Sequence, residues 1–180
     1  HRDLHSLPTR RCSDLEQGHV EARFLLGTMY SYGRGIAQND KQAAAWYRKA
    51  AEQGHVEAQY HLARMYDDGR GVVQNDKKAV VWYHKAFEQG NANALDAIYK
   101  MVKQGNTHAL NALGEIAKNG HDGAREIIIE MAEQGAAMAQ AKLGWMYNEG
   151  QGVEQDDALA VVWYRKAAEQ GHAIAQYNLG

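Results

Sequence analysis

The chain has 180 residues, with 20 basic and 22 acidic side chains and a formal net charge of −2. It contains no apolar run long enough to cross a membrane and no basic stripe, which argues against membrane insertion and against nucleic-acid binding. Its one cysteine, Cys12, excludes an intramolecular disulfide and a multi-cysteine metal site.

Residues 1–15 have no repeat character and contain the only proline, Pro8. They resemble the in-frame translation of a widely used DNA-sequencing adapter, except at Cys12, where serine would be expected. We therefore interpret residues 1–15 as a non-native leader and expect them to be disordered. The native N-terminus is then missing, and residues 16–180 are a fragment of a longer protein.

A block of 36 residues occurs twice in succession and then returns a third time. Each copy begins with Gly-x-x-x-Ala, continues through a tyrosine and a Gly-x-Gly pair, and then reaches Trp-Tyr. The full copies span residues 18–53, 54–89 and 135–170, and a truncated copy covers 171–180. A fixed period of this length predicts stacked helical units that cover one another's apolar faces.

Residues 54–89 show how one copy forms two helices. The first helix has apolar residues at i, i+4, i+7 and i+8, namely Ala58, Leu62, Met65 and Tyr66. Gly69 and Gly71 end it, since glycine enters the left-handed backbone region without steric cost. Asn75 then predicts the N-cap of a second helix, whose apolar stripe is Ala79, Trp82, Tyr83 and Ala86. We interpret the repeated tryptophans as core residues: Trp46, Trp82 and Trp163.

Residues 90–134 lack both the glycine loop and the tryptophan. They divide into three units of 15 residues, 90–104, 105–119 and 120–134, and each predicts a single helix. Because three is an odd number, a strict alternation of first and second helices cannot continue through this segment. We expect a change of curvature or a local break here.

Four histidines follow a glycine at a predicted helix start: His19, His55, His121 and His172. Helices pack about 8–10 Å apart, so equivalent residues in successive helix pairs lie too far apart to share a metal ion. We predict that these histidines cap helices, and we interpret His61 and His84 as surface or groove residues. No catalytic, cofactor or metal site is predicted, because no Walker-type phosphate loop occurs and the paired acids lie at helix ends.

The repeated pattern is Ala-x-x-x-Leu-(Gly/Ala)-x-Met-Tyr-x-x-Gly-x-Gly, followed by Gln-(Asn/Asp)-Asp and Trp-Tyr-x-Lys-Ala. It runs from Ala22 to Ala50, with close copies from Ala58 and Ala139. This pattern resembles Sel1-like repeats, which are related to tetratricopeptide repeats. The resemblance implies an all-α, right-handed solenoid of antiparallel helix pairs, with about ten helices and an irregular middle segment. It also implies a bacterial scaffold that binds a protein or peptide, in either the cytoplasm or the envelope, with its oligomeric state left open.

In arrays of this kind the first helices line the concave surface, so their unpacked stripe predicts the binding residues. Trp145, the one tryptophan outside the repeated position, is the preferred anchor because aromatic residues and arginine are common at interfaces. The full set of predicted contacts is Phe24, Glu57, Tyr60, Arg64, Trp145, Asn148 and Tyr177.

Two alternatives remain. Relatives with a cysteine pair in every repeat have been linked to penicillin binding, which suggests an enzyme of the cell-wall or β-lactam hydrolase type. Those cysteine pairs are absent here, so the sequence favours a scaffold without catalytic activity. The second alternative is that the segment is a spacer, which carries another domain in the full-length protein.

Overall fold

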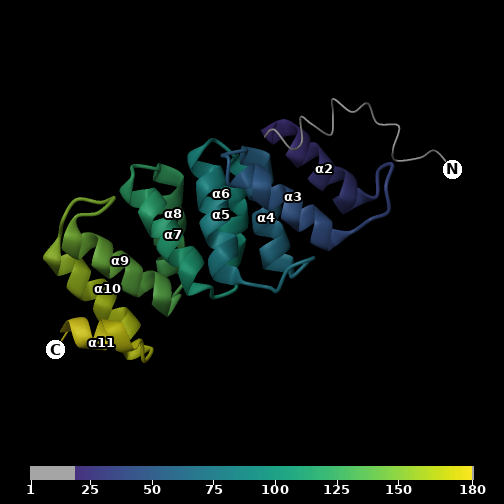
Figure 1. Cartoon of the computed structure of the whole chain (residues 1–180). Coiled ribbons are helices and arrows are strands. Elements are labelled where there is room, and N and C mark those ends of the chain that lie inside the picture. Colours follow the sequence, from purple (N-terminus) through teal and green to yellow (C-terminus); the bar gives the residue numbers. More distant parts are fainter. Residues whose placement is uncertain (1–18, 180) are drawn as a thin grey trace. The chain divides into compact units, whose positions relative to one another are not determined.

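The computed structural model describes residues 19–179, which form ten α-helices and no strand (Figure 1). The prediction of a disordered leader at residues 1–15 lies outside the described residues. The helices are α2 (Val20–Tyr32), α3 (Asp40–Ala51), α4 (Val56–Asp68), α5 (Asp76–Glu88), α6 (Ala92–Lys103), α7 (Thr107–Lys118), α8 (Asp122–Glu133), α9 (Ala137–Glu149), α10 (Asp157–Glu169) and α11 (Ala173–Leu179). None of these described helices is both long and apolar enough to cross a membrane.

The described part of the chain divides into two compact units, with the boundary between Ala94 and Leu95. The boundary falls within α6, at the start of the segment predicted to be irregular. The expected change of curvature there stays a prediction.

In the first unit, α2 packs against α3, α3 against α4, and α4 against α5. Short loops reverse the chain between them, which gives the predicted antiparallel pairs. The predicted apolar stripe of α4 is buried: Ala58, Leu62, Met65 and Tyr66. The packing of this face against neighbouring helices stabilises helices that would be marginal alone.

The prediction that the repeated tryptophans form the core is wrong. Trp46, Trp82 and Trp163 are only half-buried. A lysine ammonium three residues later lies over each ring, 4.2, 4.6 and 4.1 Å from its centre, at Lys49, Lys85 and Lys166. The tyrosines that follow the tryptophans are the buried rings: Tyr47, Tyr83 and Tyr164 are 1%, 2% and 5% exposed.

Glycines on the first helix of a pair make room for two of these tyrosines, Tyr47 and Tyr164. A Cβ atom on Gly27 would lie 2.7 Å from Cδ1 of Tyr47, and one on Gly144 would lie 2.9 Å from Cδ1 of Tyr164. Real side chains do not approach that closely, so the ring packs directly against the helix backbone. The Leu-(Gly/Ala) position of the repeat is therefore a packing site for the tyrosine.

The Gly-x-Gly loop has a separate role for each glycine. Gly69 adopts φ +68° at the end of α4, and its N–H donates to the carbonyl of Met65, which closes the helix. Gly71, at φ +67°, lies against the backbone of Asp40, where a Cβ would overlap the carbonyl group. Arg70 donates to the carboxylate of the same Asp40 over 2.8 Å, so the loop is attached to the start of α3. Asn75 caps α5, as predicted, by accepting from the N–H of Lys78.

In the second unit, the helices from α7 to α11 again pack in chain order, and α7 also contacts α9 directly. Thus α7 and α9 lie in one layer, while α8 packs against both. The three 15-residue units form α6, α7 and α8, and their central apolar side chains are fully buried: Ile98, Leu113 and Ile128.

Candidate partner-binding face

The predicted contact Phe24 is part of the packing between α2 and α4. Its ring stacks on the imidazole of His55 with centroids 4.4 Å apart, and it lies 5.9 Å from the rings of Tyr47 and His61. The ring is half-buried. Phe24 therefore connects neighbouring first helices before any partner binds.

His55 caps α4, as the sequence predicts. Its Nδ1 accepts from the N–H of Ala58 over 3.2 Å, and its Nε2 lies 3.0 Å from the carboxylate of Glu21. A neutral ring with its proton on Nε2 satisfies both contacts, because Nδ1 then accepts and Nε2–H donates. His121 and His172 cap their helices in the same way, whereas the side chain of His19 makes no capping bond. Within residues 19–179, no group of three or more His, Cys, Asp or Glu side chains is arranged to hold a metal ion.

The prediction that His61 is a surface or groove residue is incomplete. Its ring is half-buried and stacks on Tyr47, with centroids 5.1 Å apart and an angle of 11° between the planes. Burial lowers the pKa of His61 from its ordinary value because it disfavours the imidazolium, and repulsion from Arg64 lowers it further. A neutral histidine is thus part of the aromatic packing between α2, α3 and α4.

This histidine predicts a stability that depends on pH. The unfolded chain keeps the ordinary pKa of 6.5, so below that pH the unfolded state binds more protons than the folded state. The free energy of unfolding should therefore fall as the pH drops from 7.5 through about 6.5. His61→Phe keeps a ring on Tyr47 and should flatten this dependence, whereas His108→Gln, at an exposed position of α7, should not. Urea unfolding at several pH values measures the slope, and equal slopes for His61→Phe and the unmodified chain would contradict the prediction.

The other predicted contacts of the first unit lie on α4. Glu57 and Arg64 are exposed, while Tyr60 is half-buried with its ring 5.7 Å from that of Tyr83. Their spacing of three and four residues places them along one side of the helix. They offer a partner one acid, one base and the edge of an aromatic ring.

The second unit contains a more enclosed feature, which we call the Trp145 pocket. It has a volume of about 300 Å³ and is formed by side chains of α7 and α9. Residues just before α11 and within it complete the lining. It is lined by Thr107, Leu110, Asn111, Met138, Ala141, Lys142, Trp145, His172, Ile174 and Asn178. Trp145, the preferred anchor of the sequence analysis, therefore lines a pocket, and its role in binding stays a prediction.

Lys142 supports the aromatic ring in this pocket. Its ammonium lies 4.2 Å from the ring centre of Trp145, and burial lowers its pKa from the ordinary value. The side chain passes over α7 at Gly114, where a Cβ atom would overlap it. A glycine on α7 therefore admits the lysine that covers Trp145.

Sequence reasoning missed part of this lining and included residues that lie outside it. Thr107, Leu110 and Asn111 come from a 15-residue unit that could not be assigned as a first or second helix, so no repeat position identified them. Conversely, Asn148 donates to Glu149 over 2.7 Å and Tyr177 is 85% exposed, and neither lines the pocket.

A family model described as the Sel1 repeat matches residues 20–55, 56–91 and 137–172. Each match begins two residues after a repeat start identified in the sequence, at 18, 54 and 135. A Sel1-like repeat-containing protein of Acanthamoeba polyphaga mimivirus is 49% identical over 43 residues, which are 24% of this chain and 8% of that protein.

Two solved structures share the fold. A Sel1 repeat protein from Oxalobacter formigenes is 30% identical with a TM-score of 0.53, over 99% of this chain and 59% of that one. A protective antigen of uropathogenic Escherichia coli strains, which displays an SLR fold, is 28% identical with a TM-score of 0.52. That match covers 94% of this chain and 42% of the antigen. The chain therefore spans about half the length of these two proteins.

Proposed function

Because this chain belongs to the Sel1 repeat family, we propose that it is a scaffold that binds a protein or peptide segment on the face formed by α7, α9 and α11. Sel1 repeat proteins generally mediate protein–protein interactions. The observation that carries the proposal is the Trp145 pocket, where an aromatic anchor lies among apolar side chains. A bacterial source and a specific partner stay predictions.

The chemistry of the pocket fits an extended peptide. Met138, Ile174 and Trp145 offer apolar surface for one side chain. Asn111 and Asn178 carry amides that both donate to and accept from a peptide backbone. No aspartate, glutamate, serine or cysteine lines the pocket, and its one histidine, His172, uses Nδ1 to accept from the N–H of Ala175. The lining therefore offers the alternative hydrolase neither a carboxylate nor a serine or cysteine nucleophile.

The remaining predicted contacts extend this proposal beyond the pocket. Asn148 and Tyr177 lie on α9 and α11 and would contact flanking parts of a bound segment. Glu57, Tyr60 and Arg64 on α4 would form a separate contact in the first unit. We expect each of them to contribute less than Trp145, because residues away from the centre of an interface usually contribute less than a central aromatic anchor.

Replacing Trp145 with alanine tests the proposal. Peptides are selected from a displayed random library on the full chain, and their affinity is then measured by isothermal titration calorimetry. Loss of a central aromatic anchor should weaken binding by about thirtyfold, the effect of about 2 kcal/mol. Trp163→Ala is the matched control, since that ring is also half-buried and covered by a lysine but lies outside the pocket. Unchanged affinity for Trp145→Ala would exclude the pocket as the binding site.

A further inference from the structure

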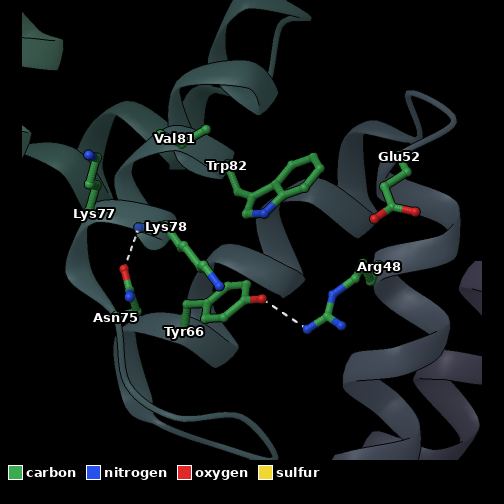
Figure 2. Close-up of a pocket in the computed structure, with 8 residues that line it drawn as sticks. All are labelled: Arg48, Glu52, Tyr66, Asn75, Lys77, Lys78, Val81 and Trp82. Carbon is green, nitrogen blue, oxygen red and sulfur yellow. Dashed lines mark hydrogen bonds between the residues drawn. The ribbon is translucent and has the colours of Figure 1, made fainter.

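A second pocket lies in the first unit, and nothing in the proposed function uses it. It has a volume of about 500 Å³ and combines residues of α3 and α5 with the end of α4 and the loop that follows (Figure 2). We call it the Trp82 pocket. Its lining residues are Arg48, Glu52, Tyr66, Asn75, Lys77, Lys78, Val81 and Trp82.

Three side chains give this pocket apolar walls. Val81 is 46% exposed, and Trp82 is half-buried although it is one of the largest side chains in the protein. Figure 2 shows the indole of Trp82 projecting from α5 toward the side of the pocket that carries Arg48 and Glu52. The ring of Tyr66 lies below it. An apolar side chain of a partner would therefore find aromatic surface that the fold leaves partly uncovered.

The pocket is also basic. Three cations, Arg48, Lys77 and Lys78, and one carboxylate, Glu52, give its lining a formal charge of 3 − 1 = +2. A fourth cation borders it, because the ammonium of Lys85 lies 4.6 Å from the ring centre of Trp82.

Two of the cations, Arg48 and Lys78, are held in place by an aromatic ring and not by carboxylates. Arg48 donates to the hydroxyl of Tyr66 over 2.9 Å, and the ammonium of Lys78 lies 5.3 Å from the centre of the same ring (Figure 2). Among the described residues, no ion pair involves Arg48, Lys77 or Lys78. The bond to Tyr66 uses one of the five N–H donors of Arg48. The positive charges of Arg48, Lys77 and Lys78 are therefore available to an anionic partner.

The other repeats show that the fold does not require these two lysines. The equivalents of Lys78 are Gln42 in the first copy and Leu159 in the third, and the equivalent of Lys77 in the third copy is Ala158. All three copies nevertheless form the second helix of the pair, as α3, α5 and α10. The Lys77-Lys78 pair is thus a feature of one repeat, added to a helix that forms without it.

We propose that the Trp82 pocket binds an acidic peptide segment of a partner protein that also carries an apolar or aromatic side chain. Carboxylates of the segment pair with Lys78 and Arg48, and its apolar side chain packs on Trp82. Charge complementarity selects the acidic segment, and the indole and valine surface selects a peptide over a simple anion. Nucleic acid is disfavoured, because the cations form a single cluster on a chain with a net charge of −2. This site is independent of the Trp145 pocket.

The test uses the full chain and a fluorescein-labelled peptide, Asp-Glu-Asp-Phe-Glu-Asp, with fluorescence anisotropy as the measurement. The same peptide with every acid replaced by its amide, Asn-Gln-Asn-Phe-Gln-Asn, is the matched probe. Lys77→Ala with Lys78→Gln introduces residues that the chain itself has at the equivalent positions, Ala158 and Gln42, so folding should be retained. Lys41→Ala is the control, because it removes a lysine from the same helical position of α3 outside the pocket.

We expect the acidic peptide to bind at least tenfold more tightly than its amide counterpart, and more weakly as salt is added. The double lysine variant should weaken binding by about five- to tenfold, as expected for two partly exposed ion pairs, and Lys41→Ala should leave it unchanged. Amide shifts in two-dimensional NMR spectra should concentrate near Lys78, Trp82 and Arg48. Equal binding of the two peptides, or an equal loss with Lys41→Ala, would overturn the proposal. Displacement of the peptide by an equimolar dT oligonucleotide would assign the pocket to nucleic acid instead.

Discussion

Replacing Tyr83 with alanine should lower the free energy of unfolding by about 3–5 kcal/mol, the range for truncating a buried aromatic side chain. Tyr83 is 2% exposed, and its ring lies 5.7 Å from that of Tyr60. Its hydroxyl lies 3.5 Å from the carboxylate of Asp67, and burial raises its pKa well above the ordinary value. The substitution therefore leaves a cavity between α4 and α5 and removes a hydrogen-bond donor to the carboxylate of Asp67.

The neighbouring residue provides the control. Trp82→Ala removes a larger side chain, but that ring is only half-buried and lies partly open to the Trp82 pocket. Its loss should cost only about 1–2 kcal/mol, because less apolar surface returns to water. Urea unfolding followed by circular dichroism at 222 nm compares the two variants. If Trp82→Ala were as destabilising as Tyr83→Ala, the assignment of the core to the tyrosines would fail.

The same pair of residues shows where sequence reasoning reached its limit. Ala79 and Ala86 define a buried stripe on α5, and both Trp82 and Tyr83 fit the helical spacing between them. Size favoured the tryptophan, since large apolar rings are usually buried. In the first and third copies a deciding signal lies in the preceding helix, where Gly27 and Gly144 leave space for the rings of Tyr47 and Tyr164 against the backbone. The second copy has Ala63 at this position. That signal becomes specific only when the packing partner of the glycine is known.

The helices themselves were predictable, because their start and stop signals are local. Asn75 caps α5 through a residue three positions away, and Gly69 closes α4 through a residue four positions away. The Trp145 pocket was predictable only in part. Trp145 departs from the repeat pattern and could be identified directly, whereas Leu110 and Asn111 reach the pocket through the contact between α7 and α9. No pattern within the 15-residue units indicates that contact.

A second large effect is expected at Gly71, where the loop after α4 meets the backbone of α3. Gly71→Ala would place a residue with a side chain at φ +67°, which costs about 1–2 kcal/mol for a non-glycine residue. The new Cβ would also overlap the carbonyl of Asp40, so the loop must move away from α3. That movement stretches the bond between Arg70 and Asp40. With a further cost of about 1–3 kcal/mol for overpacking, the total loss of stability should be about 2–5 kcal/mol.

Gly54→Ala separates the two contributions to this effect. Gly54 also has a positive φ, +87°, but only the side-chain oxygen of Gln89, at 3.9 Å, would come near a new Cβ. This variant should therefore show the backbone cost alone, about 1–2 kcal/mol. Both variants are compared by urea unfolding, with the m-value as a check that the same surface is exposed. A larger loss for Gly71→Ala supports direct backbone packing between consecutive helix pairs, whereas equal losses would mean that the loop does not rest on α3.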